Sequence, residues 1–307
     1  MIKNKVSVII PTKDRYSELL ICLESIKNQT IQPKEIIIVD SSLNDDVKKA
    51  IKKYKSLPIK YFRSNPGSGY QRNRGAEKSK GDIILFSDDD TIWEKECLEK
   101  ILEVFEKFPN RIGVVSGSPI LERENFLRKL SLKFYYFISK IFLLAKPGNG
   151  RFKISGRPEV YPRDIKEIKR CEFIYGFYMA MKKELWKKFP WDENFKIYGW
   201  NEEDDLAYNI TKNGYKNYYT PFARVRHTMP NRKNRYKNVN ASQKKIEYHY
   251  YLFKKNMPQD LKHKLAFWWS VLGTIIQDSL LCILNGKIDG VKGLLKGILN
   301  IRKQKFA

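Results

Sequence analysis

This 307-residue chain has few cysteines, and its acidic residues are far outnumbered by basic ones. Its four cysteines lie far apart without CxxC spacing, so the sequence signals neither a zinc site nor a disulfide framework. Asp and Glu number 34 against 59 Lys and Arg, which leaves a formal charge of +25. Part of this excess is typical of a Lys-rich composition, but a charge of this size requires an anionic partner: nucleic acid, anionic lipid or a phosphorylated ligand.

The N-terminal segment leaves no room for a signal peptide, because residues 1–5 lead directly into a predicted strand. We therefore expect the chain to begin its work in the cytoplasm. A hydrophobic content of 42% with 13% aromatic residues excludes a disordered protein, and the length allows one large domain or two.

The first half of the chain alternates regularly between strands and helices. Apolar runs predict strands at 6–10, 35–40, 59–62 and 83–86, and helical spacing predicts helices at 17–27, 46–54 and 71–80. Alternation with near-continuous apolar strands is typical of an α/β fold with a mostly parallel, doubly wound sheet.

Polar segments follow three of these strands, namely Pro11-Thr12, Asp40-Ser41-Ser42 and Asp88-Asp89-Asp90. Ligands of such sheets bind outside the carboxyl ends of the strands, so one crevice can gather all three segments. The coincidence favours a ligand site more strongly than any one segment does.

Three adjacent aspartates place like charges a few ångströms apart, which is costly without a cation. Asp88 and Asp90 are two apart on an extended chain and point the same way, so both can reach one hard divalent ion. A solvated acidic turn, or a helix N-cap before residues 93–96, is the alternative for an isolated acidic triplet.

Two further segments suit a nucleotide ligand. Asp40 is a lone acceptor for the N–H edge of a base or for a ribose hydroxyl. Residues 67–75 supply glycines, a helix N-terminus and two arginines, which together form a plausible seat for a pyrophosphate. A plain loop-to-helix connection is the alternative for these glycines.

Four blocks, at residues 6–15, 35–40, 72–75 and 81–90, resemble in order and spacing those of the family 2 glycosyltransferases, which have the GT-A fold. The resemblance implies a nucleotide-sugar donor (a UDP-sugar is favoured), Asp40 on the nucleoside, a DxD metal site for Mn²⁺ or Mg²⁺ at Asp88 and Asp90, and an inverting single displacement. The candidate donor-binding residues are Pro11, Thr12, Arg15, Asp40, Ser42, Gly69, Arg72, Asn73, Asp88 and Asp89.

The second half resembles the acceptor side of the same family. Residues 175–186 are similar to its strand-and-helix wall, and four acids at 202–205 open a helix that we expect to end near Lys212. Acids in a first helical turn also favour the helix dipole, although one or two suffice for that. The resemblance implies a carboxylate base here, and counting back from Leu206 gives Glu203, with Asp204 as the second choice. The candidate acceptor-binding residues are Tyr175, Gly176, Trp200 and Glu202.

His227 follows a short apolar strand. A lone histidine is more often structural or solvated, and imidazole is a less common ligand than carboxylate for this class of metal. Relatives place a histidine at this point as a further metal ligand, so His227 joins Asp88 and Asp90 in the predicted metal site.

The C-terminal region is unlike a soluble enzyme. Residues 224–264 contain 12 Lys and Arg but only 2 acidic residues. Residues 265–284 are predicted to form an apolar helix long enough to span a bilayer. Its polar residues Ser270, Thr274, Gln277 and Asp278 share one face, which favours a helix lying in the membrane interface over a spanning one. A helix packed on the catalytic domain is the alternative.

Two more segments fit this interpretation. Residues 126–146 form a basic amphipathic helix, and glycines at 286, 290, 293 and 297 predict a smooth face for close helix packing. We therefore predict a catalytic domain at 1–235, with a donor half at 1–115 and an acceptor half at 116–235 that carries the 126–146 insertion, followed by a helical extension at 236–307.

The expected function is glycosyl transfer by a peripheral enzyme on the cytoplasmic side of the cell membrane. Its expected partners are a nucleotide-sugar, a lipid-linked or glycan acceptor and an anionic membrane surface, without nucleic acid; the sequence does not give the oligomeric state. One alternative is a nucleotidyltransferase acting on a sugar phosphate, but it would require a Gly-rich loop after the first strand. The other is a nucleic-acid-binding protein, for which the chain has the charge but no accompanying motif.

Overall fold

The structure is a computed structural model that describes residues 6–120, 126–161, 165–195, 201–228, 239–284 and 288–302. The chain forms two compact units. The first contains Met1–Leu121, Arg163–Tyr198 and Leu206–Met229, and the second contains Glu122–Pro162, Gly199–Asp205 and Pro230–Ala307.

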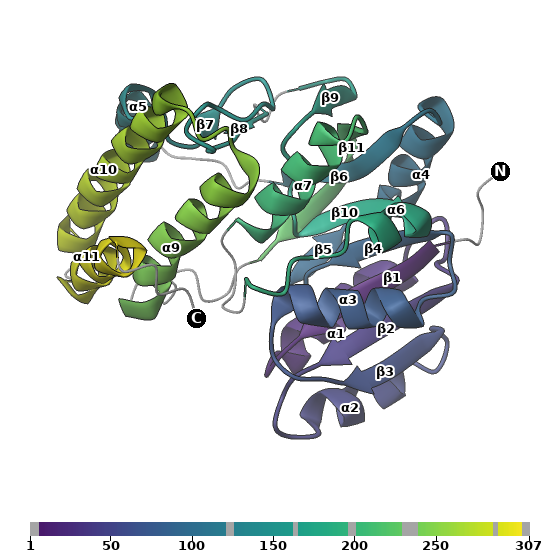
Figure 1. The fold of residues 1–307 in the computed structure, drawn as a ribbon. Helices are drawn as coiled ribbons and strands as arrows, with labels where there is room; N and C mark the ends of the chain where they lie inside the picture. The colour runs from purple at the N-terminus through teal and green to yellow at the C-terminus, as the bar shows by residue number, and fades with distance from the viewer. Residues whose placement is uncertain are drawn as a thin grey trace. The chain divides into compact units, whose positions relative to one another are not determined.

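A nine-stranded sheet forms the centre of the first unit (Figure 1). Its first half is parallel, in the order β3-β2-β1-β4. These strands are β1 (Val6–Thr12), β2 (Glu35–Asp40), β3 (Ile59–Arg63) and β4 (Ile83–Ser87). All four were predicted. The apolar residues of β2 and β4 and most of those of β1 are buried because helices cover both faces, whereas those of the edge strand β3 are half-buried.

The second half of the sheet is mixed. β10 (Tyr178–Lys182) runs antiparallel between β4 and β6 (Ile112–Ile120). β6 then pairs in parallel with the long strand β11 (Lys216–His227), whose end pairs with β5 (Thr91–Trp93). β9 (Lys169–Cys171) pairs with β11 away from this path.

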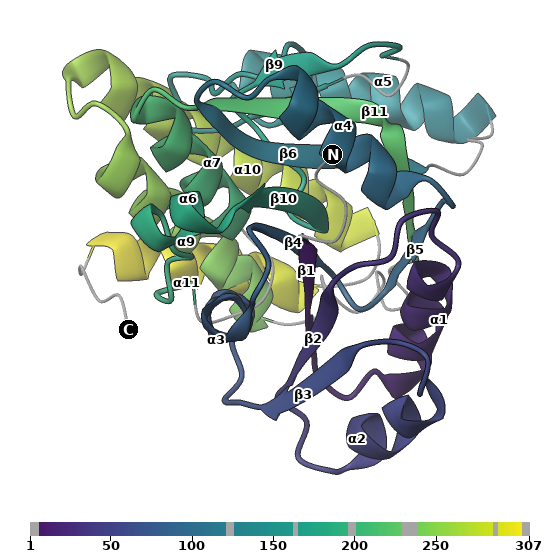
Figure 2. The ribbon, with the colours of Figure 1, turned by 90° about the vertical axis from the view of Figure 1, so that its right-hand side faces the viewer.

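Helices cover both faces of this sheet (Figure 2). One face carries α1 (Tyr16–Lys27), α2 (Asp46–Ala50) with a short 3₁₀ turn (Ile51–Lys53), and α4 (Cys97–Lys107), and the other carries α3 (Ser68–Lys78) and α6 (Lys183–Lys188). α3 packs very closely on β1, since a Cβ on Gly75 would lie 2.4 Å from Ile9 Cγ2. Only glycine fits there.

The N-terminus of α3 differs from the prediction, which started this helix at Gln71. The helix begins at Ser68, directly after Gly67, whose φ of 140° is easily adopted only by glycine. Gly69 therefore lies in the first helical turn, against the backbone of Asp192.

Helices make up most of the second unit. They are α5 (Phe126–Ile141), α9 (Val239–Asn256), α10 (Leu261–Leu284) and α11 (Ile288–Arg302), accompanied by the short pair β7 (Lys146–Pro147) and β8 (Glu159–Val160). Gly293 and Gly297 pack against the backbone of α9, which confirms the predicted close packing at these two positions. α7 (Glu202–Lys212) has its first four residues in this unit.

The insertion and the C-terminal helices belong to the same compact unit. Within this unit Gln277 of α10 donates to Tyr135 O and Ser139 Oγ of α5, at 3.2 and 3.1 Å.

α10 presents its polar face to the protein and its apolar face outward, so the predicted polar stripe does not face water. Ser270, Thr274, Gln277 and Asp278 are all buried. The exposed side chains on this helix include Leu265, Trp268, Leu272, Ile276 and Leu280. Among the described residues, one helix (Leu261–Ile283) is long and apolar enough to cross a membrane, and 50% of its most apolar window is buried.

Candidate active site

The three aspartates form the turn between β4 and β5, and backbone bonds fix this turn. Asp88 N donates to Phe177 O at 3.0 Å, and Thr228 N donates to Asp90 O at 2.9 Å. The pairing of β11 with β5 sets His227 opposite Thr91, next to the turn. Segments more than 130 residues apart in sequence therefore meet at the end of β4.

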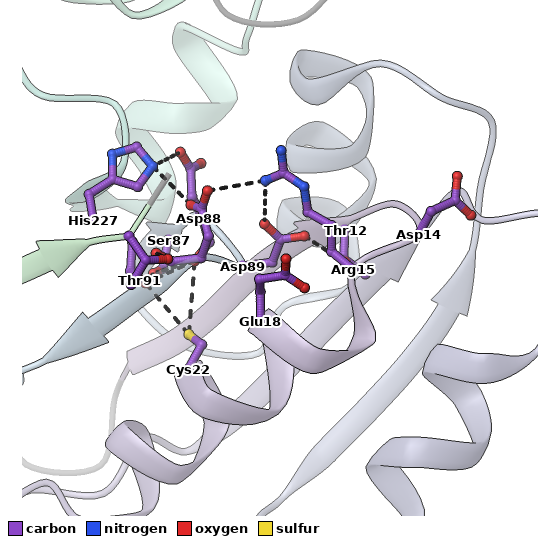
Figure 3. Close-up of polar contacts among 12 residues, drawn as sticks. Thr12, Asp14, Arg15, Glu18, Cys22, Ser87, Asp88, Asp89, Thr91 and His227 are labelled. Atoms are coloured by element: carbon purple, nitrogen blue, oxygen red, sulfur yellow. Dashed lines mark hydrogen bonds and ion pairs between the residues drawn. The ribbon is translucent and has the colours of Figure 1, made fainter. Parts of the chain in front are cut away.

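Asp88, Asp90 and His227 form a cluster that can hold a metal ion, since their ligand atoms all lie within 4.8 Å of one another. His227 Nε2 lies 2.8 Å from Asp90 Oδ1 and 3.7 Å from Asp88 Oδ2. Figure 3 shows His227 next to Asp88 at the end of β4. Its ring stacks on Phe177 at 5.1 Å between centroids. Two carboxylates and one imidazole are hard and borderline donors that suit Mn²⁺, so the residues present fit the predicted divalent ion.

Two arginines offset the negative charge of the aspartate turn. Arg72 Nη2 lies 2.8 Å from Asp88 Oδ1, and Arg15 Nη1 lies 3.2 Å from Asp89 Oδ1 and 3.1 Å from Asp90 Oδ2. From the sequence we expected a metal ion alone to offset the repulsion among the three aspartates. In the structure these two arginines offset part of it.

Asp89 is turned toward β1 rather than toward the metal cluster. It accepts a hydrogen bond from Thr12 Oγ1 at 2.7 Å as well as the contact from Arg15 (Figure 3). Burial raises the pKa of Asp89 to about 7, Arg15 opposes the shift, and the neighbouring Asp90 adds to it.

A pocket of about 330 Å³ adjoins the aspartate turn. It is lined by Pro11, Thr12, Lys13, Arg15, Ser41, Pro66, Gly67, Ser68, Gln71, Arg72, Asp88 and Asp89. Three basic side chains and the N-terminus of α3 border it, which is the environment that anionic phosphates require.

Arg72 is the most buried of these three basic side chains. It is 4% exposed and lies over the Trp191 ring at 4.6 Å, while Trp191 meets Phe86 edge to face at 5.5 Å. The second arginine of the predicted phosphate seat, Arg74, instead pairs with Glu77 on the surface of α3 at 3.0 Å.

Four of the predicted donor residues are not among the described residues that line the pocket: Asp40, Ser42, Gly69 and Asn73. Asp40 is fully buried, and its carboxylate accepts bonds from Ser42 Oγ at 2.5 Å and from Tyr61 at 2.8 Å. Asn73 bonds Trp191 through both ends of its amide, which ties α3 to the loop after α6.

The predicted acceptor wall at residues 175–186 comprises β10 and part of α6, and its residues Tyr175 and Gly176 lie in the segment between β9 and β10. Tyr175 packs against Phe173, Phe177 and Tyr219, with ring centroids 5.0, 5.6 and 5.9 Å apart, and Gly176 separates it from Phe177 in the chain. Trp200 falls outside the described residues.

The four acids of the α7 first turn, described within the second unit, differ in their surroundings. Glu202, Asp204 and Asp205 are buried, whereas Glu203 is partly exposed. Burial raises the pKa of Asp204 to about 6, against the opposing effects of Asn201 and Arg157.

Several residues that shape the site were not predicted. Phe177 holds Asp88 through its backbone and His227 through its ring, but an aromatic residue beside a strand carries no signal of that role in the sequence. Gln71 anchors the pocket wall, since its amide donates to Thr12 O at 3.0 Å and to Val39 O at 2.7 Å. Lys13 and Ser41 lie within segments that the sequence had singled out.

Comparisons with known proteins agree with this geometry. Residues 7–165 match the model of glycosyl transferase family 2. An uncharacterized glycosyltransferase of Haemophilus influenzae is 40% identical over 34% of this chain and 35% of its own. A GalNAc(5)-diNAcBac-PP-undecaprenol beta-1,3-glucosyltransferase of Campylobacter jejuni is 28% identical over 72% of this chain and 74% of its own.

Solved structures share the fold. The mannosyltransferase PcManGT of Pyrobaculum calidifontis, in complex with GDP-Man and Mn²⁺, superimposes with a TM-score of 0.60 and 14% identity over 99% of this chain and 88% of its own. The fold is therefore the predicted GT-A type. Because the family model covers more than half of the chain, this protein belongs to glycosyl transferase family 2 and is a glycosyltransferase.

Proposed function

We propose that the protein transfers a sugar from a nucleoside diphosphate donor to a hydroxyl of a lipid-linked saccharide, with inversion at the anomeric carbon. One observation supports this most: Asp88, Asp90 and His227 converge within 4.8 Å beside a pocket bordered by Arg15 and Arg72. A metal-ligand cluster next to a cationic pocket suits a diphosphate.

The donor diphosphate would lie between the aspartate turn and the N-terminus of α3. Arg15, Arg72 and Lys13 would bind its oxygens, with Gly67 leaving the first backbone N–H groups of α3 accessible. Asp88, Asp90 and His227 would hold a divalent ion, which when bound supplies charge that stabilises the departing diphosphate.

Glu203 is the proposed general base. An inverting displacement needs one carboxylate that takes the acceptor proton as the glycosidic bond forms. Of the four described acids in the α7 turn, only Glu203 is partly exposed, while Asp204 and Asp205 are buried against their own partners. This burial favours Glu203 over Asp204.

Support for a lipid-linked acceptor comes from the second unit. Apolar side chains are exposed along the length of α10. Phe134, Phe137 and Ile141 of α5 are also exposed, at 58, 60 and 45%. Lys133 and Lys140 lie on the same helix. Apolar side chains flanked by lysines suit peripheral attachment to an anionic membrane, and we propose the cytoplasmic side. The name of the Campylobacter jejuni relative points to a lipid-linked acceptor for that enzyme.

A screen of nucleotide-sugars by thermal unfolding, with Mn²⁺, Mg²⁺ or EDTA, tests the donor half of this proposal. We expect one nucleotide family to raise the Tm when Mn²⁺ or Mg²⁺ is present, because ligands that bind only the folded state stabilise it. Equal stabilisation by unrelated nucleoside triphosphates, or none by any nucleotide-sugar, would count against it.

A further inference from the structure

Within the second unit, two contacts from α9 hold the acidic first turn of α7. Asp205 Oδ2 lies 2.8 Å from Lys255 Nζ, and Asp205 Oδ1 accepts a bond from Asn256 Nδ2 at 2.6 Å. The Asp205 side chain is 4% exposed, so both contacts are shielded from water on its side.

A second set of contacts holds the neighbouring Asp204. Its Oδ2 accepts a bond from Asn201 Nδ2 at 2.9 Å, and Asn201 has a φ of 66°, a conformation that asparagine tolerates better than most residues. The charge of the fully buried Arg157 acts on Asp204, and Arg157 Nη2 reaches Thr274 Oγ1 of α10 at 3.4 Å. Two of the four acids therefore serve the architecture of the turn.

The helix dipole of α7 does not by itself explain why Asp204 and Asp205 are buried and paired. Acids favour a helix N-terminus, but exposed carboxylates serve that purpose without desolvation. Burying a carboxylate against a lysine and an asparagine has a large desolvation cost that the pairing offsets only in good geometry. What it adds is a fixed orientation of the backbone that also carries Glu203, one to two residues away.

We infer that Asp205 and Lys255 are positioning residues, which fix the first turn of α7 and with it the direction of the Glu203 carboxylate. The inference rests on the proposed role of Glu203 as the base. It adds that a contact from the C-terminal helices, outside the family match at residues 7–165, determines how well that base is aimed.

A double-mutant cycle between Asp205→Ala and Glu203→Gln tests this inference in the full-length protein. We expect Asp205→Ala alone to lower kcat about 10- to 100-fold with an unchanged KM for the donor, because small misplacements of a catalytic group are costly. In the Glu203→Gln background the same change should have almost no further effect on kcat, since there is no base left to aim. A merely structural role would lower both activities equally.

Lys255 provides a second test from the other side of the pair, because its side chain is 31% exposed and Asp205 keeps the hydrogen bond from Asn256 after Lys255 is replaced. Lys255→Met should lower kcat, and Lys255→Arg should restore most of it. Lys146→Met is the matched control, since it removes an ion pair to Glu159 in the same unit and should leave kcat unchanged.

The outcomes separate the two proposals. If Glu203→Gln keeps full activity, the base assignment itself fails. If Glu203→Gln is inactive while Asp205→Ala and Lys255→Met match wild type, the base stands and the positioning role is refuted. Equal losses from Asp205→Ala in both backgrounds also refute it.

Discussion

Asp90 is the residue at which the proposed role of metal ligand can best be tested by substitution. It is 2% exposed and contacts both Arg15 and His227. Asp→Asn keeps its shape and removes its charge. The change therefore tests the ligand role with little disturbance to packing.

We predict that Asp90→Asn abolishes the Mn²⁺-dependent part of nucleotide-sugar binding while the protein stays folded. Losing one of three ligands weakens the ion's hold on the diphosphate. Isothermal titration with and without Mn²⁺ measures this directly. Asp46→Asn, an exposed acid at the start of α2, is the control and should bind as wild type does. Metal-dependent binding that survives in Asp90→Asn would remove Asp90 from the site.

We predict that Glu203→Gln binds the donor normally but transfers sugar ~10²–10⁴-fold more slowly, the usual contribution of a positioned base. Single-turnover kinetics with a saturating donor separates this loss from a binding defect. Asp204→Asn is the informative comparison, because it alters the adjacent buried carboxyl. The assignment moves by one position if Asp204→Asn is inactive and Glu203→Gln is not.

The site residues that could be predicted from the sequence are those whose own position next to a predicted strand marks them. Asp88 and Asp90 stand at the end of an apolar strand, so strand-end reasoning reached both, whereas His227 was added from the family resemblance. The partners of these residues were not predictable. Arg15 and Phe177 meet the aspartate turn only because β1 and β10 flank β4, and that order cannot be read from spacing alone.

At the scale of the elements, the parallel strands were predictable because their apolar runs are nearly continuous. The mixed half was harder, since β11 extends over 12 residues and only its last part was recognised. The outward apolar face of α10 could not be predicted either. A stripe of polar residues gives the same pattern whether it faces water or a buried network that includes Arg157.

Within α9, we predict that His249 makes stability depend on pH. Burial, together with the charge of Arg157, holds the pKa of His249 well below 6.5, while Nε2 lies 2.9 Å from Ser155 O. As pH falls below 6.5 the unfolded chain gains a proton at this position and the folded protein does not, so stability decreases. The expected loss between pH 7.5 and 5.5 is on the order of 1 kcal/mol.

Denaturant unfolding of wild type and His249→Gln at both pH values measures this contribution. The raised pKa of Asp204 acts in the opposite direction, because its folded form binds a proton at a higher pH than the unfolded chain does. The test is therefore the difference between wild type and His249→Gln in how the free energy of unfolding changes with pH. Identical pH dependence in wild type and His249→Gln would exclude His249 as a source.

At the scale of the whole molecule, the charge of +25 and the exposed apolar side chains of the second unit favour the same partner. Basic residues near anionic headgroups contribute about 1 kcal/mol each and are screened by salt. Apolar side chains add a component that salt does not remove.

We predict that the protein sediments with anionic vesicles and resists release by high salt. Leu272→Glu with Ile276→Glu, at positions 44 and 45% exposed on α10, should weaken sedimentation at least ~10-fold, because burying each side chain is worth about 1.5–3 kcal/mol. Leu43→Glu is the matched control, since this leucine is 99% exposed in the first unit. Wild-type protein that stays in the supernatant, or an equal loss in the control, would contradict membrane attachment through α10.

The most direct test of metal-assisted glycosyl transfer is the release of nucleoside diphosphate from a nucleotide-sugar, measured with membrane lipid extract as acceptor. We predict release in the presence of Mn²⁺ or Mg²⁺ for wild type, its loss in EDTA, in Asp90→Asn and in Glu203→Gln, and the appearance of the sugar in the lipid fraction. Release that persists in EDTA and in both variants, or sugar that never enters an acceptor, would contradict the account.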